Sequence, residues 1–392
     1  MSKFFVAGRI EFLGKHTDYC GGRSLVCAID KGFLVDHAEN PNGLIKVLNS
    51  DTGEKTEFPF DEHLTIGEGG WENYPRTVAK RVAFNFKSRP LKGVDIRFSS
   101  NLPQAAGVSS SSAFIVAIFN AISQANSLPD FEEYKRNIRN KYELGNYLGC
   151  LENGYDFGEL KGNKGVGTFG GSQDQTAIIC CHKNTLSRFS FRPVRHEGDF
   201  PLSEDQSFVI AASGVVAEKT GAAKEKYNRL SLMSQEIAAE IDGSLSLAQI
   251  VETYGFDEVK ARLGQGELVD RLTQFYHESF EIIPAVSELL RLGEISKIGP
   301  LVDLSHQNAD RLLSNQVPET NFLQRTGREL GAIAASAFGA GFGGSVYALV
   351  KKSEDRDFLA EWQARYFAGF PQHREKAEFF VTSAGESRLD GD

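Results

Sequence analysis

The chain has 392 residues, of which 41% are hydrophobic and 24% are charged, a composition typical of globular proteins and unlike disordered or membrane proteins. This length exceeds one ordinary core and predicts two domains in close contact. The formal net charge of −9 argues against broad nucleic-acid binding, and no stretch approaches the roughly 18 apolar residues that would span a bilayer.

In the first half, a Gly-rich turn at Gly21 and Gly22 separates the first two predicted strands. Alternating and β-branched runs predict strands over residues 4–12, 24–33 and 94–99. Apolar or amphipathic periodicity predicts helices over residues 112–124 and 131–149. Residues 162–171 are rich in glycine and lysine, which predicts a loop.

The second half is expected to be mainly helical. Strands are predicted over residues 208–212 and 345–350, and helices over residues 222–241, 268–292, 301–314 and 323–338. Pro193, Gly198 and Pro201 cluster within residues 192–207 and indicate a boundary, which gives predicted domains over residues 1–200 and 201–392. Mixed α+β architecture fits these elements better than a regular βαβ alternation.

Residues 102–113, LPQAAGVSSSSA, lie between a predicted strand and a predicted apolar helix. Small residues let the backbone approach an anion, and the start of a helix offers N–H groups to a phosphate. Serine hydroxyls add donors and can face Mg²⁺. Taken alone, the same run equally fits a helix that is simply capped by serine.

Four motifs, in this order along the chain, resemble those of the GHMP kinases. GRIEFLGKHTDY at residues 8–19 is similar to the galactokinase signature GRxNxxGEHTDY, and the serine run is similar to the second GHMP motif, PxGxGLSSSA. GSQDQ at residues 171–175 resembles the galactokinase GIMDQ, and FGAGFGGS at residues 338–345 resembles the third GHMP motif. Shorter similarities, WENY, YNR, SH and VPET, lie at residues 71–74, 227–229, 305–306 and 317–320.

The resemblance implies the two-domain GHMP kinase fold, α+β, with a ribosomal-protein-like N-terminal domain and a ferredoxin-like C-terminal domain. It implies that Asp174 is the catalytic base and that Arg9 holds the carboxylate ionised and stabilises the transferring group. The implied cofactors are ATP and Mg²⁺. Gly107, Ser109, Ser110 and Ser111 would bind ATP, and Ser111 and Glu152 would serve the metal ion.

The resemblance also implies a sugar site formed by Lys15, His16, Asp18, Gly171, Tyr227 and Gly341. Asp18 can accept hydrogen bonds from two adjacent hydroxyls, which suits a vicinal diol. The expected reaction is direct in-line transfer of the γ-phosphate of ATP to the anomeric hydroxyl of galactose or a close relative.

The chain departs from the family pattern at several positions. Lys15 replaces a glutamate that contacts the 6-hydroxyl of the sugar, Glu11 replaces an asparagine, and Ala105 replaces a glycine of the serine loop. Lys15 would suit the carboxylate of a galacturonate, could donate to a neutral hydroxyl, or could pair with Glu11. Residues 153–170 are longer than usual and could form either a lid over the sugar or an inert surface loop.

Three alternatives to a galactose kinase stay open. They are a galacturonokinase-like enzyme that uses Lys15, a catalytically silent sugar and ATP sensor, and a non-sugar GHMP kinase, against which residues 16–19 argue. The expected partners are a small sugar and ATP, without nucleic acid or membrane, and the expected assembly is a monomer or weak homodimer. Five cysteines without metal or redox spacing and no signal-peptide pattern predict a cytoplasmic location.

Overall fold

The computed structural model describes the chain except for residues 1, 68–69, 103–106, 167–168, 216–220 and 392. Its larger sheet contains eight strands: β1 (Ser2–Leu13), β2 (Arg23–Asn40), β3 (Leu44–Asn49), β4 (Lys55–Pro59), β5 (Gly93–Ser100), β6 (Thr185–Ser190), β7 (Arg195–Pro201) and β12 (Ala384–Gly385). Their order is β4-β3-β5-β2-β6-β7, and β1 and β12 both pair with β2. All pairs are antiparallel except β3 with β5.

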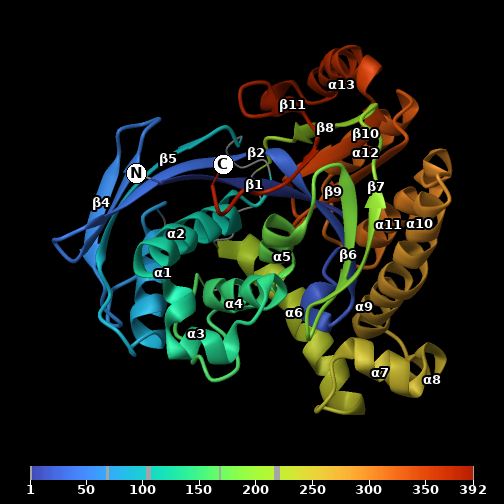
Figure 1. Ribbon diagram of the computed structural model, residues 1–392. Coiled ribbons are helices and arrows are strands. Elements are labelled where there is room, and N and C mark those ends of the chain that lie inside the picture. Colours follow the sequence, from blue (N-terminus) through green and yellow to red (C-terminus); the bar gives the residue numbers. More distant parts are fainter. Residues whose placement is uncertain (1, 68–69, 103–106, 167–168, 216–220, 392) are drawn as a thin grey trace.

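A smaller antiparallel sheet has the order β11-β8-β10-β9, with strands β8 (Gln206–Ala212), β9 (Ala334–Phe338), β10 (Ser345–Lys351) and β11 (Glu378–Thr382). Successive side chains of its strands point to opposite faces. In β10, Tyr347 and Leu349 face the core of the larger sheet, whereas Val346 and Ala348 face the other side. There they meet Trp362 in α13, the helix that crosses this sheet at the top of Figure 1.

Thirteen α-helices are described. Those of the first half are α1 (Asn73–Asn85), α2 (Ser110–Asn126), α3 (Glu132–Asn137), α4 (Lys141–Asn153) and α5 (Gln173–Cys180). Those of the second half are α6 (Gly221–Ile241), α7 (Leu247–Tyr254), α8 (Phe256–Leu263), α9 (Glu267–Tyr276), α10 (Ile283–Arg291), α11 (Gly299–Arg311), α12 (Pro318–Glu329) and α13 (Asp355–Gly369). Within the described chain, none of them has the length and apolar character needed to cross a membrane.

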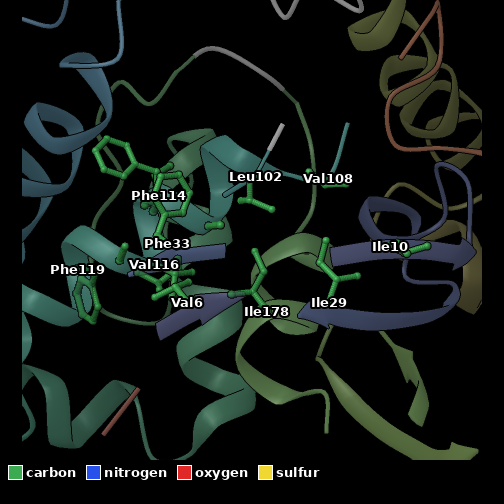
Figure 2. Packing of buried hydrophobic residues seen from close by; sticks show 14 of the residues in the cluster. Val6, Ile10, Ile29, Phe33, Leu102, Val108, Phe114, Val116, Phe119 and Ile178 are labelled. Atoms are coloured by element: carbon green, nitrogen blue, oxygen red, sulfur yellow. The ribbon is translucent and has the colours of Figure 1, made fainter. Parts of the chain in front are cut away.

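The largest core lies between the larger sheet and α2. Figure 2 shows Phe114, Val116 and Phe119 of this helix beside Val6 and Phe33 from the strands. These side chains are almost completely buried, and burying each is worth about 1.5–3 kcal/mol of stability. Packing of this kind fixes the start of α2, where the serine run lies, against β1.

Strand β1 has two irregularities in its pairing with β2, one between Ala7 and Arg9 and one between Glu11 and Leu13. A bulge inserts an extra residue, bends the strand and re-aims the side chains beside it. Gly32 lies opposite the first irregularity, and a Cβ atom there would lie 2.0 Å from the carbonyl oxygen of Val6. The bulges therefore set the direction of the arginine at the start of the signature.

The α+β fold is confirmed, and all five predicted strands are present, as β1, β2, β5, β8 and β10. The helix expected over residues 323–338 is wrong in its second half, because α12 ends at Glu329 and β9 occupies Ala334–Phe338. Gly331, with φ of 96°, follows the end of the helix, and the alanine-rich run that follows is fully buried as a strand. The helix expected over residues 131–149 is split, and Asn140 caps its second part, α4, by accepting from Tyr142 N–H and Glu143 N–H.

The predicted domain boundary at residue 200 lies at the end of β7, just before the chain passes to β8 in the other sheet. Near its end the chain crosses back to the larger sheet, because β12 pairs with β2 (Figure 1). The division into two domains stays a prediction. Ala105 lies outside the described residues.

Candidate active site

Asp174 stands in the first turn of α5, where three side chains contact its carboxylate. Arg9 Nε donates to Oδ1 at 2.7 Å and Ser109 Oγ donates to Oδ2 at 2.5 Å, while Ser112 Oγ, whose proton goes to Glu152, lies 3.4 Å from Oδ2. The aspartate side chain is 22% exposed, whereas that of the arginine is 5% exposed. The structure thus brings together the predicted base and its predicted partner, and leaves the carboxylate open to a ligand.

Arg9 also connects the signature to the serine run. Its Nη1 donates to the carbonyl oxygen of Gly107 at 2.7 Å, and its backbone N–H donates to Val108 O at 3.2 Å. Gly339 in the third motif lies close by, since a Cβ atom there would be 3.6 Å from Gly107 O and 3.8 Å from Arg9 Nη2. Three motifs that are distant in sequence therefore meet at one guanidinium.

The serine run is not an ordinary cap. Ser109 is the N-cap of α2 and has a left-handed φ of 59°, yet its side chain makes no capping bond. Its hydroxyl goes to Asp174 instead. Without that cap, the helix start can offer backbone N–H groups to a phosphate. Ser110 and Ser111 follow in the first turn, both half-buried.

Glu152 at the end of α4 is nearly fully buried behind this turn. Ser112 Oγ and Gln175 Nε2 donate to its Oε2 at 2.8 Å and 2.5 Å. Ser112, whose hydroxyl donates to Glu152, is the neighbour of the predicted Ser111. A buried carboxylate among serine hydroxyls fits Mg²⁺, which binds through a few oxygen ligands together with water and phosphate. In the described part of the chain, no three His, Cys, Asp or Glu side chains form a metal cluster.

Asp18 lies beside the segment that leads to the predicted base. Its Oδ1 accepts from Tyr19 N–H at 2.8 Å and its Oδ2 from Gln173 N–H at 3.1 Å. A Cβ atom at Gly171 would lie 2.3 Å from Oδ2, so glycine is required there for the two segments to approach. Burial raises the pKa of this carboxyl, while the two N–H donors oppose that rise.

His16 has a left-handed φ of 58° and uses both ring nitrogens within the protein. Nε2 lies 3.1 Å from the carbonyl oxygen of Ala340, so Nε2 carries the proton, and Nδ1 accepts from the hydroxyl of Tyr19 at 2.7 Å. Burial and the nearby charge of Arg271 lower the pKa of His16 to about 3. The ring of Tyr227 lies against the imidazole, with centroids 5.2 Å apart.

Lys15 and Gly341, two of the predicted sugar contacts, are packed against other parts of the protein. Lys15 is 1% exposed, and its ammonium donates to Ser305 Oγ at 3.0 Å. That hydroxyl donates in turn to Glu278, whose carboxylate also accepts from Gly14 N–H. In the described structure Lys15 makes no ion pair with Glu11 within 4 Å. A Cβ atom at Gly341 would lie 2.6 Å from Asn315 O, so that glycine packs on a buried asparagine.

Ser112, Gln173 and Ala340 are functional candidates that sequence reasoning missed. Gln173 links the signature to the base, because its Nε2 donates to Glu11 at 2.6 Å and its Oε1 accepts from Ser24 at 2.5 Å. The only signal was position: each of the three lies inside or directly beside a motif.

Three family models match the chain. They are the galactokinase galactose-binding signature at residues 3–36, the GHMP kinases N-terminal domain at residues 73–154 and the GHMP kinases C-terminal domain at residues 285–368. The galactokinase of Pyrococcus furiosus is 27% identical, with 95% of this chain and 98% of that protein covered. The galactokinase of Dictyostelium discoideum is 25% identical, with 94% and 84% covered.

Solved structures agree on the fold. The galactokinase of Lactococcus lactis in complex with galactose superposes with a TM-score of 0.81 at 22% identity, covering 99% of this chain and 95% of that one. A mevalonate kinase superposes with a TM-score of 0.62 at 15% identity, covering 98% and 99%. Fold and site together define a small-molecule kinase. The chain belongs to the GHMP kinase family and carries the sugar-binding signature of its galactokinase branch.

Proposed function

We propose that the chain is an ATP-dependent kinase that transfers the γ-phosphate in line to the anomeric hydroxyl of galactose or a close relative. The observation that carries this proposal is the environment of Asp174. Its partly exposed carboxylate is held by Arg9 and Ser109 at the start of α2 and lies one residue from Gln173, whose N–H donates to Asp18. A base, a phosphate-binding element and a diol-binding carboxylate are thus adjacent.

In this arrangement Asp174 accepts the proton of the sugar's anomeric hydroxyl while the oxygen of that hydroxyl attacks the γ-phosphorus of ATP and ADP leaves. Arg9 pairs with the carboxylate and offsets negative charge near the transferring group. Asp18, Gly171 and Tyr227 contact the sugar and orient it. When bound, Mg²⁺ neutralises charge on the phosphates. Glu152 and the hydroxyls of Ser111 and Ser112 would hold it.

The test is a coupled ADP-release assay with galactose, galacturonate, arabinose, fucose and N-acetylgalactosamine. We expect turnover with galactose and a product whose phosphorus resonance couples to the anomeric proton. Turnover with uronates alone would replace galactose by an acidic sugar, and binding of sugar and ATP without ADP release would make the protein a sensor. Either result would overturn the proposal in its present form.

A further inference from the structure

A cavity lies beside two of the proposed sugar contacts. Asp18 and Gly171 form part of its wall, and Asn146, Tyr155 and Arg192 line it from three other segments. The asparagine comes from α4, the tyrosine from the long segment that follows this helix, and the arginine from the loop between β6 and β7. Asn146, Tyr155 and Arg192 have no part in the proposed transfer to the anomeric hydroxyl.

Arg192 brings an available positive charge to the cavity. Its side chain is exposed, and within the described residues it has no hydrogen-bond or ion-pair partner. Its φ of 58° is left-handed, a conformation that an L residue other than Asn, Asp or His rarely adopts. Its positive charge opposes the rise that burial causes in the pKa of Asp18, so the guanidinium lies near the sugar site. A planar guanidinium is suited to bidentate binding of a carboxylate.

The other walls suit a sugar. The amide of Asn146 also has no hydrogen-bond partner among the described residues, so it can serve a ligand. Tyr155 exposes 38% of its surface and offers an aromatic face. Asn153, one helical turn beyond the tightly packed Gly149, donates to Gly171 O at 3.0 Å and so fixes the glycine at the cavity wall.

The segment after α4 therefore forms part of the cavity wall. Side chains of α1 hold residues 155–161 of this segment in place. Arg81, which is fully buried in α1, donates to Tyr155 O at 2.8 Å and to Leu160 O at 3.4 Å. Asn85 donates to Lys161 O at 3.0 Å. Segments of extra length that line a ligand cavity are a common source of substrate preference.

We propose that this cavity is a subsite for a carboxylate carried by the sugar substrate, and that Arg192 determines specificity for it with Asn146 as a second donor. The inference rests on the proposed function and adds relatives of galactose that carry a carboxylate to its substrate class. The carboxylate can belong to a uronic acid or to an acidic substituent on a hydroxyl near Asp18. Lys15 is not its ligand here, because its buried ammonium is bound to Ser305.

The experiment measures kcat and KM for galacturonate and 3-O-carboxymethylgalactose, each against its neutral counterpart, galactose and 3-O-methylgalactose. Arg192→Gln should raise KM for at least one acidic sugar about tenfold more than for its neutral counterpart, because a charge-assisted hydrogen bond is lost. Arg195→Gln is the matched control, since this exposed arginine lies in the same region but outside the cavity, and it should change neither. The acid that responds identifies the source of the carboxylate.

Equal effects on acidic and neutral sugars would overturn the subsite. If no sugar is phosphorylated, the proposed function fails, but calorimetric binding of the same four sugars still decides the subsite. Weaker binding of an acidic sugar to the Arg192 variant, with unchanged binding to the control variant, would support it. Identical affinities for all three proteins would refute it.

Discussion

Asp174 illustrates how much of a residue's role depends on its neighbours. An isolated aspartate in a loop is an ordinary turn residue. Here its two oxygens are held by side chains from β1 and α2, which lie 165 and 65 positions away in the chain. Motif order could predict that Asp174 and Arg9 meet. The left-handed Ser109 that turns its hydroxyl from the helix to the aspartate leaves no trace in the sequence.

Replacing Asp174 by Asn should remove the proposed base with little change in shape. We expect kcat to fall by about 10²–10⁴-fold, the usual contribution of general base catalysis, while calorimetric affinity for ATP stays within a few-fold. Asp257→Asn, on an exposed face of α8, should leave kcat unchanged. Comparable turnover of the two variants would exclude Asp174 as the base.

Glu11 allows a prediction about pH. Burial raises the pKa of this carboxyl from 4.5 to about 7, against the opposing charges of Lys15 and Arg9. Since the folded state holds the proton more tightly, this stabilisation is complete below about pH 4.5 and is lost as the pH rises through 7. The Glu11→Gln side chain cannot ionise. The difference in unfolding free energy, variant minus wild type, should therefore increase by at most about 3 kcal/mol from pH 5 to pH 8.

Urea unfolding at pH 5, 6, 7 and 8 measures this difference. Using the difference between the two proteins cancels the opposite trend from His16, whose lowered pKa costs stability as the pH falls. Exposed Glu252→Gln is the control and should run parallel to the wild type. A constant offset for the Glu11 variant would mean that its carboxyl does not titrate in this range.

At the scale of elements, the short strands predicted over residues 208–212 and 345–350 are present, whereas β9 was predicted as the end of a helix. The run Ala334–Phe338 is rich in alanine and too short for its pattern to distinguish helix from strand. Its pairing with β10 decides the outcome, and that partner follows a glycine-rich turn. The segment after α4 shows the same limit, because its contacts are made by Arg81, about 75 positions earlier in the chain.

Arg81→Ala should loosen that segment. It removes donors from two carbonyl groups and leaves a cavity beside Tyr147, so we expect about 3–5 kcal/mol of destabilisation. Hydrogen exchange should accelerate across residues 155–162 before it does in β5. Arg76 on the same helix contacts Phe58 of β4 instead. Arg76→Ala should therefore accelerate exchange in β4. Exchange that rises equally everywhere in both variants would show that Arg81 does not anchor the segment.

At the scale of the whole molecule, the two sheets share one core. Tyr347 of β10 stacks on Phe12 of β1, with ring centroids 5.0 Å apart, and its hydroxyl donates to Phe12 O at 2.7 Å. This contact lies in the same strand as Arg9 and Glu11, so packing between the sheets helps to position the arginine that is proposed to act in catalysis. The α+β fold was predictable from the resemblance of the motifs. The return of the chain end to the first sheet was not, since residues 383–391 carry no motif and only two of them pair as a strand.

That return gives the last prediction. Arg388 and Phe5 exchange two backbone hydrogen bonds of 2.9 Å and 3.1 Å, Asp30 N–H donates to Ser383 O, and Asn120 and Gln124 donate to Leu389 O. At about 1 kcal/mol each, their loss predicts a decrease of roughly 3–5 kcal/mol in unfolding free energy when residues 383–392 are removed. Removing residues 390–392 keeps these bonds and should cost much less. Because β1 carries Arg9, the longer truncation should also weaken ATP binding below the melting temperature, and unchanged affinity would show that the strand holds its position without the chain end.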